Sequence, residues 1–410
     1  MPESADTPQA SVVIPTYNRS DKLRKTLETM TEQDVDPSRF EVIVADDGSS
    51  DDTVDVARSF AGRLRLKYYF QEDKGFRAGA ARNGGARLAS APVLIFLDSG
   101  TLAGPGLVGG HLAVHAASEE RRAVIGYCYG YDAFREDLWA PDSFDTLRPV
   151  EIVRLYHDNV EFADIREIDY VRYGSSPMKW ALPWLFFFTM NCSVPADDFW
   201  AAGGFDEMFR SWGVEDIELG YRLFHGGINI VLSRDAWAIE VPAKRPVRQL
   251  IYSLMRNGRL FLGKSREPYI ELLADSYLGI RFSSVMEEGF ELARWTQAAR
   301  EVDVHAEIED AAVGLAADTR LAIFGCGPSV PWRLPSAALL DFDADLLARA
   351  TANGMHAGYH AIGLRTALPA KSADVVIVTS RLSGLWPRFG DQIMREAGRV
   401  GQRVVVTTRP

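Results

Sequence analysis

Short apolar runs alternate with amphipathic stretches over the first hundred residues of the chain. Four of these runs predict buried strands, at residues 11–15, 40–45, 64–70 and 93–97. Between the first two runs, Leu23, Leu27 and Met30 recur at helical spacing. Strands that alternate with helices indicate an α/β fold, with a mostly parallel sheet covered by helices on both faces.

This rhythm is interrupted and then resumes. Residues 120–180 carry many aromatic and charged side chains without a clear period, and the alternation returns over residues 184–240. A compact helix is predicted to begin near Glu215 and to stop at Gly226 and Gly227, because glycine commonly ends helices.

The carboxyl-terminal part has a different pattern. Residues 245–315 are predicted to be helical, and from Arg320 a strand, a glycine turn and a second strand indicate a separate small α/β unit. We therefore predict three domains: residues 1–245 (with halves 10–110 and 111–245), 246–315 and 316–410.

Polar residues follow the ends of the predicted strands. They lie at the end of segment 13–19 (Val-Ile-Pro-Thr-Tyr-Asn-Arg) and in segments 46–49 (Asp-Asp-Gly-Ser) and 98–100 (Asp-Ser-Gly), and a Glu-Asp pair opens the helix within 212–216. Each segment alone is an ordinary turn or helix start. Because ligands of open α/β sheets bind beyond the carboxyl ends of the strands, their order favours one shared site.

Composition limits the class of protein. The 410 residues are 47% hydrophobic and 25% charged, as in soluble globular proteins, and no apolar run approaches the ~20 residues of a membrane-spanning helix. The net charge of −11 argues against a nucleic-acid partner. The first ten residues are polar and acidic rather than a secretory signal, so a cytoplasmic location is expected.

The three cysteines, Cys128, Cys192 and Cys326, are odd in number and far apart. They fit neither a disulfide framework nor a zinc site, and we expect three buried thiols.

Several motifs resemble the family 2 glycosyltransferases of the GT-A fold over residues 10–245. They are Pro15-Thr16-Tyr17-Asn18-Arg19, Asp46-Asp47-Gly48-Ser49, Lys74-Gly75 with Ala81-Arg82-Asn83, and Gly203-Gly204-Phe205-Asp206. The segment Trp212-Gly213-Val214-Glu215-Asp216 is also similar to the carboxyl half of β-galactosyltransferases and chondroitin polymerases. The resemblance implies a Rossmann-like mixed sheet with helices on both faces.

The resemblance also implies a nucleotide-sugar site made by Pro15, Thr16, Tyr17, Asp47, Arg82 and Asp98. Tyr17 would pack against the base, Asp47 would accept hydrogen bonds from the base or ribose, and Asp98 would face the ribose and diphosphate. Arg82 would either lie near the diphosphate or hold the acidic loops in place.

The same resemblance makes Asp216 the general base that deprotonates the acceptor, with Glu215 binding the acceptor or orienting the loop. It implies inverting transfer from a UDP- or dTDP-linked sugar to a glycan, peptide or small natural product. A bifunctional glycosyl- and methyltransferase and a non-catalytic sugar-nucleotide-binding protein remain as alternatives.

The chain departs from the family at the metal motif. Most relatives carry Asp-x-Asp, and here the second position is Gly100. One hypothesis is that Asp98 and Glu240 hold Mg²⁺ or Mn²⁺; its rival is that Arg or Lys side chains stabilise the departing diphosphate without metal.

The carboxyl-terminal segment Ile323-Phe324-Gly325-Cys326-Gly327-Pro328, followed by Leu339-Leu340-Asp341-Phe342-Asp343, resembles class I S-adenosylmethionine methyltransferases. In that family the glycine turn approaches the cofactor and the acid, here Asp343, holds its ribose. Prolines crowd the expected first helix and the last strands of such enzymes are missing. We therefore expect a shortened Rossmann-like domain that serves packing, dimerisation or docking rather than methyl transfer.

Overall fold

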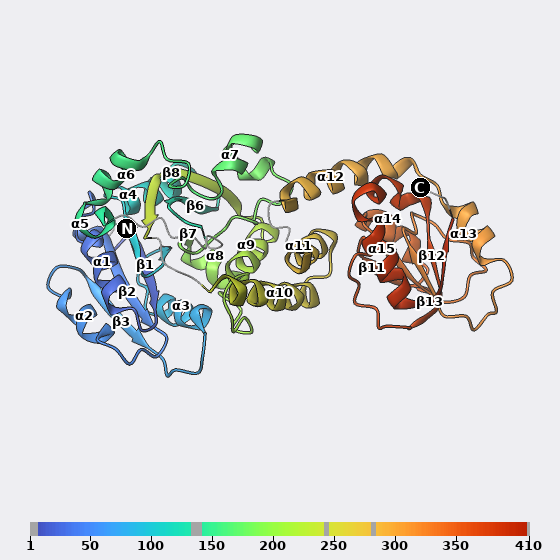
Figure 1. Ribbon diagram of the computed structural model, residues 1–410, viewed down its shortest axis with the longest axis horizontal. Coiled ribbons are helices and arrows are strands. Elements are labelled where there is room, and N and C mark those ends of the chain that lie inside the picture. The colour runs from blue at the N-terminus through green and yellow to red at the C-terminus, as the bar shows by residue number, and fades with distance from the viewer. Residues whose placement is uncertain (1–6, 133–141, 242–245, 280–283, 408–410) are drawn as a thin grey trace. The chain divides into compact units, whose positions relative to one another are not determined.

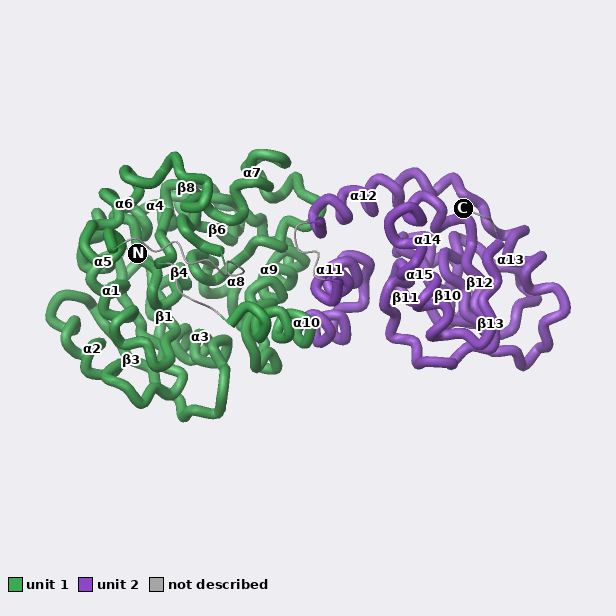
Figure 2. The backbone as a smooth tube through the Cα atoms, in the orientation of Figure 1, with its two compact units in different colours: residues 1–257 green, residues 258–410 purple. Residues whose placement is uncertain are grey.

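The structure is a computed structural model that describes residues 7–132, 142–241, 246–279 and 284–407 (Figure 1). The chain divides into two compact units, Met1–Asn257 and Gly258–Pro410 (Figure 2). Among the described residues, no helix combines the length and the apolar character needed to cross a bilayer.

The amino-terminal unit is built on an eight-stranded mixed sheet with the order β3-β2-β1-β4-β7-β6-β8-β5. The strands are β1 (Ala10–Thr16), β2 (Phe40–Asp46), β3 (Leu66–Phe70), β4 (Val93–Leu97), β5 (Thr101–Ala103), β6 (Arg122–Tyr129), β7 (Asn191–Pro195) and β8 (Asn229–Glu240). The four strands predicted in the first hundred residues are confirmed as β1 to β4, and they pair in parallel. The antiparallel pairings of β7 with β4 and of β5 with β8 make the sheet mixed.

Helices cover both faces of this sheet. The helices of this unit are α1 (Ser20–Met30), α2 (Thr53–Ser59), α3 (Ala78–Arg87), α4 (Leu107–Ala116), α5 (Ser143–Thr146), α6 (Pro149–Tyr156), α7 (Glu167–Tyr173), α8 (Ala196–Ala201), α9 (Glu215–His225) and the first part of α10 (Val247–Lys264). On one face, Val12 of β1 belongs to the same buried cluster as Leu27 of α1. On the other face, a Cβ added to Gly85 of α3 would lie 2.8 Å from Val13 Cγ1, so glycine lets this helix approach the strands closely.

The predicted compact helix is α9, which begins at Glu215 and is followed by Gly226 and Gly227. All three cysteines are free and buried, as expected.

The carboxyl-terminal unit is a parallel five-stranded sheet with helices on both faces and a helical region before it. Its helices are α11 (Pro268–Gly279), α12 (Val285–Ala298), α13 (His305–Ala312), α14 (Ala344–Thr351) and α15 (Trp386–Val400). Its strands, in the order β11-β10-β9-β12-β13, are β9 (Leu321–Phe324), β10 (Ala337–Asp341), β11 (Ala357–His360), β12 (Ala373–Val378) and β13 (Gly401–Val406). The predicted strand, glycine turn and strand are β9, the turn at Gly325 and Gly327, and β10.

The acidic residues after β10 are bonded within the unit. Asp341 accepts hydrogen bonds from Arg381 Nε at 2.7 Å, Arg381 Nη2 at 3.2 Å and the Gly327 amide at 2.8 Å. The side chains of Asp341 and Arg381 are both fully buried. Arg381 therefore neutralises Asp341 and ties it to the glycine turn.

Asp343, which the resemblance assigned to the cofactor ribose, is also engaged. Its carboxylate accepts from Arg300 Nε at 2.8 Å and from the amides of Asp345 and Leu346 at 3.1 and 3.3 Å, so it caps the start of α14. Because the glycine turn and both acids already have internal partners, this arrangement does not fit S-adenosylmethionine.

We expect no saturable heat when S-adenosylmethionine is titrated into the full chain at micromolar concentrations in a calorimeter. The hydrogen bonds of Asp343 to Arg300 would have to open for the ribose to bind. Asp341 is held in a fully buried pair with Arg381, and breaking such a pair is strongly unfavourable. Saturable binding at micromolar ligand would contradict this interpretation of the strand ends.

Candidate functional site

The carboxyl ends of three parallel strands form one edge of the amino-terminal sheet. β1 pairs with β2 on one side and with β4 on the other, so Tyr17, Asp47 and Asp98 leave the sheet at the same edge. β7 runs antiparallel to β4, and Asn191 pairs with Leu97, which brings the start of β7 to this edge as well. The topology therefore brings the residues that are predicted to bind the nucleotide sugar to this one edge of the sheet, called the donor rim below.

The β1 and β2 ends are joined by backbone and side-chain bonds. The Asp47 amide donates to the carbonyl of Thr16, the residue after Pro15, at 2.9 Å. The Asp47 carboxylate accepts from Gln71 Nε2 at 2.6 Å and from the Arg77 amide at 2.7 Å. Burial raises the pKa of Asp47 above its ordinary value, and these hydrogen bonds oppose the rise.

Tyr17 keeps an exposed ring at this end of the site. Its side chain is 44% exposed, and its hydroxyl donates to Asp73 Oδ2 at 2.8 Å. The hydrogen bond to Asp73 raises the pKa of Tyr17, because it favours the protonated phenol. A flat ring fixed at its hydroxyl and open on a face suits stacking on a nucleotide base.

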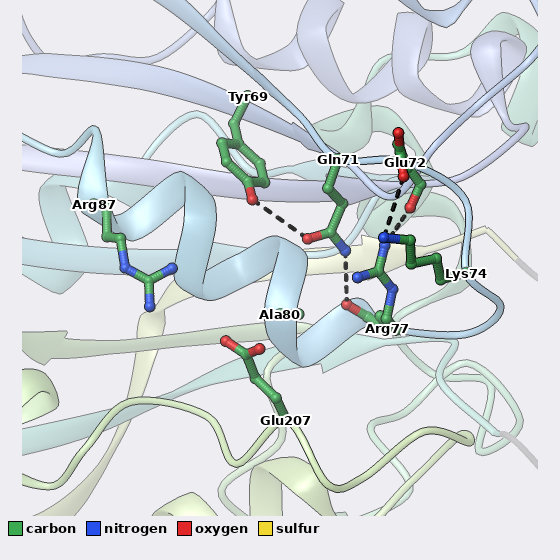
Figure 3. Close-up of a pocket in the computed structure, with 8 residues that line it drawn as sticks. All are labelled: Tyr69, Gln71, Glu72, Lys74, Arg77, Ala80, Arg87 and Glu207. Atoms are coloured by element: carbon green, nitrogen blue, oxygen red, sulfur yellow. Dashed lines mark hydrogen bonds and ion pairs between the residues drawn. The ribbon is translucent and has the colours of Figure 1, made fainter.

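A polar hollow of about 330 Å³ lies beside Asp47. Figure 3 shows the eight residues that line it, which are Tyr69, Gln71, Glu72, Lys74, Arg77, Ala80, Arg87 and Glu207. Gln71 and Arg77 also hold the Asp47 carboxylate, so the hollow and the nucleotide end of the site share two residues. The lining has three cationic and two anionic side chains, and it therefore favours a polar or anionic ligand group.

Arg82 of α3 joins the two halves of the site. Its guanidinium is buried and donates to Asp98 Oδ1 at 2.7 Å and to Glu215 Oε1 at 3.4 Å. It also acts electrostatically on Asp216, and all three carboxylates raise its pKa. Arg82 thus connects the turn that carries Asp98 to the start of α9.

Glu215 and Asp216 occupy the first turn of α9, where the helix dipole favours carboxylates. Asp216 accepts from the Ile217 amide at 2.8 Å and from the Thr189 amide at 3.4 Å, which orients it towards the start of β7. Burial and the neighbouring Asp216 raise the pKa of Glu215 to about 7, although Arg82 opposes the rise. Burial also raises the pKa of Asp216.

Glu240, the last residue of β8, lies next to the turn that carries Asp98. It pairs with Thr101 of β5, and the Val241 amide donates to the Gly100 carbonyl at 3.4 Å. Gly100 has φ +97°, and a Cβ placed there would lie 3.1 Å from Cδ of Lys22. The stem of Lys22 therefore packs over the position where most relatives carry the second carboxylate.

The residues predicted from motifs are thus all placed on this rim or beside it, and several of their partners were missed. Gln71, Asp73 and Arg77 belong to the loop between β3 and α3, close to the Lys74-Gly75 motif, which could have directed attention to them. Thr189 acts through its backbone amide, for which residue type gives no signal.

Two family models match the amino-terminal unit. Residues 11–170 match the model of glycosyl transferase family 2, and residues 171–240 match the model described as the N-terminal domain of galactosyltransferase. Both matches end before the carboxyl-terminal unit, and its likeness to methyltransferases is not confirmed.

The chain is also similar to curated proteins, over nearly its whole length or over part of it. It is 42% identical to the validoxylamine A glucosyltransferase of Streptomyces hygroscopicus subsp. limoneus, over 98% of this chain and 91% of that protein. It is 31% identical to the chondroitin synthase of Escherichia coli, over 53% of this chain and 32% of that protein. A solved structure of TarS from S. aureus has a TM-score of 0.44 at 16% identity and covers 71% of this chain and 79% of that one.

The mixed sheet, the ordered motifs along its rim and the near full-length similarity lead to one assignment. The amino-terminal unit has the mixed α/β sheet that the resemblance to family 2 implied. The chain belongs to glycosyl transferase family 2, and it is a glycosyltransferase.

Proposed function

We propose that the protein is an inverting glycosyltransferase that uses a nucleotide diphosphate sugar, UDP- or dTDP-linked. The observation that carries the proposal is the buried Arg82, which joins Asp98 on the donor rim to Glu215 beside Asp216. A donor bound along the rim would therefore end next to a carboxylate whose pKa is raised.

In this proposal the nucleotide binds across the β1 and β2 ends. The Tyr17 ring stacks on the base, and Asp47 accepts hydrogen bonds from the base or ribose. Pro15 and Thr16 form the backbone beneath it, and the Thr16 carbonyl is already bonded to the Asp47 amide. Asp98 faces the ribose and the diphosphate.

The chemical step is a single displacement. Asp216 removes the proton from an acceptor hydroxyl as the oxygen attacks the anomeric carbon, and the bond from that carbon to the diphosphate oxygen breaks. The nucleotide diphosphate leaves with the bonding electron pair, and the configuration inverts. Burial makes Asp216 a stronger base than a solvated aspartate, which suits proton removal near neutral pH.

The relative that is similar over most of both chains suggests the substrates. Because 42% identity extends over 98% of this chain, we propose glucose as the sugar and validoxylamine A or a similar small natural product as the acceptor. Glu215 would orient the loop rather than touch the acceptor, because it is 5% exposed and paired with Arg82.

We propose that Asp98 and Glu240 hold a divalent cation together with the diphosphate of the donor. Mg²⁺ and Mn²⁺ sites of transferases typically combine one or two carboxylates with substrate phosphates. Asp98, whose side chain is 40% exposed, and Glu240 are two such carboxylates on adjacent segments. Across the described ranges no group of three or more acidic, His or Cys side chains is arranged for a metal, so the diphosphate would complete the site. A bound cation would neutralise charge that develops on the leaving diphosphate.

The rival is that side-chain cations perform this task. Arg82 and Lys22 both lie at the Asp98–Gly100 turn, the first by its ion pair and the second by its packing on Gly100. A preorganised cation close to the leaving oxygens would supply the same electrostatic stabilisation.

Substitution of the proposed base tests the mechanism. We expect Asp216→Asn to lower kcat by roughly 10²–10⁴-fold, because a general base contributes about that factor. Nucleotide-sugar binding, measured by the thermal shift, stays near that of the parent protein. Asp197→Asn is the matched control, since Asp197 is an exposed carboxylate in the first turn of α8. An unchanged rate in folded Asp216→Asn would refute the assignment.

The dependence of kcat on pH reports the same group. Burial raises the pKa of Asp216, and only the ionised carboxylate accepts a proton, so the rate is lost as pH falls through this raised pKa. We expect Glu215→Gln to move this acidic limb to lower pH, because it removes a like charge next to Asp216. An acidic limb that stays in place, or lies near pH 4 in the parent protein, contradicts the raised pKa.

Chelation separates the two ways of stabilising the leaving group. We expect EDTA to abolish transfer, Mn²⁺ to restore it, and Glu240→Gln to require a higher Mn²⁺ concentration for half of the maximal rate. Full activity in EDTA would reject the metal hypothesis and assign stabilisation of the leaving diphosphate to Arg82 and Lys22. Lys22→Met would then lower kcat.

A further inference from the structure

Helix α10 holds the loop that leads into α9. Asn257 of α10 is 1% exposed, and its amide nitrogen donates to the carbonyl oxygens of Ser211 at 2.9 Å and Gly213 at 2.6 Å. A longer bond of 3.4 Å reaches the Trp212 carbonyl, and the Ser211 hydroxyl donates to Asn257 Oδ1 at 2.9 Å. One buried amide therefore binds three consecutive residues of the loop.

Packing against α10 reinforces these hydrogen bonds. Gly213 has φ +87°, and a Cβ placed there would lie 2.7 Å from Cδ2 of Leu254. Leu254 is buried and precedes Asn257 by three positions, so both side chains point from the same face of the helix. The backbone of the loop therefore lies directly against α10.

The next residue, Val214, has an unfavourable backbone conformation. Its φ is +79°, in the left-handed region that β-branched residues rarely adopt. Such a conformation persists only when the surroundings impose it. The Val214 carbonyl accepts the Glu218 amide at 2.8 Å, which is the first hydrogen bond of α9. The place where α9 starts therefore depends on Val214 being kept left-handed.

We infer that Asn257 is a positioning residue for the pair Glu215 and Asp216. By holding residues 211–213, it keeps Val214 left-handed and so fixes where the Asp216 carboxylate meets the acceptor. The inference rests on the proposed role of Asp216 as the base. The two family matches end at residues 170 and 240, so Asn257 lies beyond both and the family motifs do not mark it.

The principal test is Asn257→Ala in the full chain. We expect kcat per folded molecule to fall by roughly 10²-fold, since small misplacements of reacting groups have effects of that size. The KM for the nucleotide sugar stays unchanged, because Tyr17 and Asp47 are held by the β3–α3 loop instead. Tyr252→Ala is the control on the same helix, since this side chain is 58% exposed.

A second pair of variants separates positioning from a general loss of structure. In the Asn257→Ala background, Val214→Gly should restore part of kcat, because glycine adopts positive φ without strain. Val214→Ala removes similar packing but keeps a Cβ in the left-handed region, and it should restore nothing. Equal rates in these two double variants would overturn the inference.

Two further outcomes complete the test. If Asn257→Ala does not fold, Ser211→Ala is tested instead, because it removes only the hydroxyl that orients the Asn257 amide. An unchanged kcat of Ser211→Ala overturns the inference. A lower kcat at unchanged KM supports it. If Asp216→Asn retains its rate, the proposed base is wrong. If Asp216→Asn is inactive and Asn257→Ala keeps its kcat per folded molecule, the inference about Asn257 fails by itself.

Discussion

The buried guanidinium of Arg82 is the cation around which the acidic site is assembled. Asp98 follows a strand, Glu215 and Asp216 open a helix more than a hundred residues later, and all three act on this one side chain. Carboxylates this close would repel one another without it, and a buried charge without a partner is strongly destabilising. The arrangement makes the donor rim and the helix α9 parts of one electrostatic unit, although they come from distant parts of the chain.

Local pattern was sufficient for much of the fold. The strands β1 to β4 and the helix α9 were predictable because apolar period and turn residues are local properties. The motif residues were found because a turn after a strand can be read from neighbouring positions. The hydrogen bonds of Asn257 and the contact of Thr189 with Asp216 could not be found in this way. They join positions 27 to 46 residues apart, and they are made by amide, hydroxyl and backbone groups that occur throughout the chain. The mixed character of the sheet likewise depends on which strands return antiparallel.

The two units use an Asp–Arg pair in opposite ways. In the amino-terminal unit, Arg82 is buried but its partner Asp98 remains 40% exposed, so the carboxylate can still face a ligand. In the carboxyl-terminal unit, Arg381 and Asp341 are both fully buried and also bind the glycine turn. Two sheets with similar strand patterns therefore differ in what their strand ends can bind. In the first pair, Asp98 is accessible to a ligand, whereas in the second pair neither side chain is accessible. Function here follows the side chains at the strand ends rather than the fold.

The position of α10 has a practical consequence for anyone shortening this protein. The second family-model match ends at residue 240, and a fragment cut there would contain each residue that the motifs mark. It would lack helix α10, whose Asn257 amide and Leu254 side chain hold residues 211–213 in place. The smallest autonomous transferase therefore extends past Asn257. Because α10 continues to Lys264 without a break, a cut directly after Asn257 would place the hydrogen bonds of its side chain at a fraying helix end.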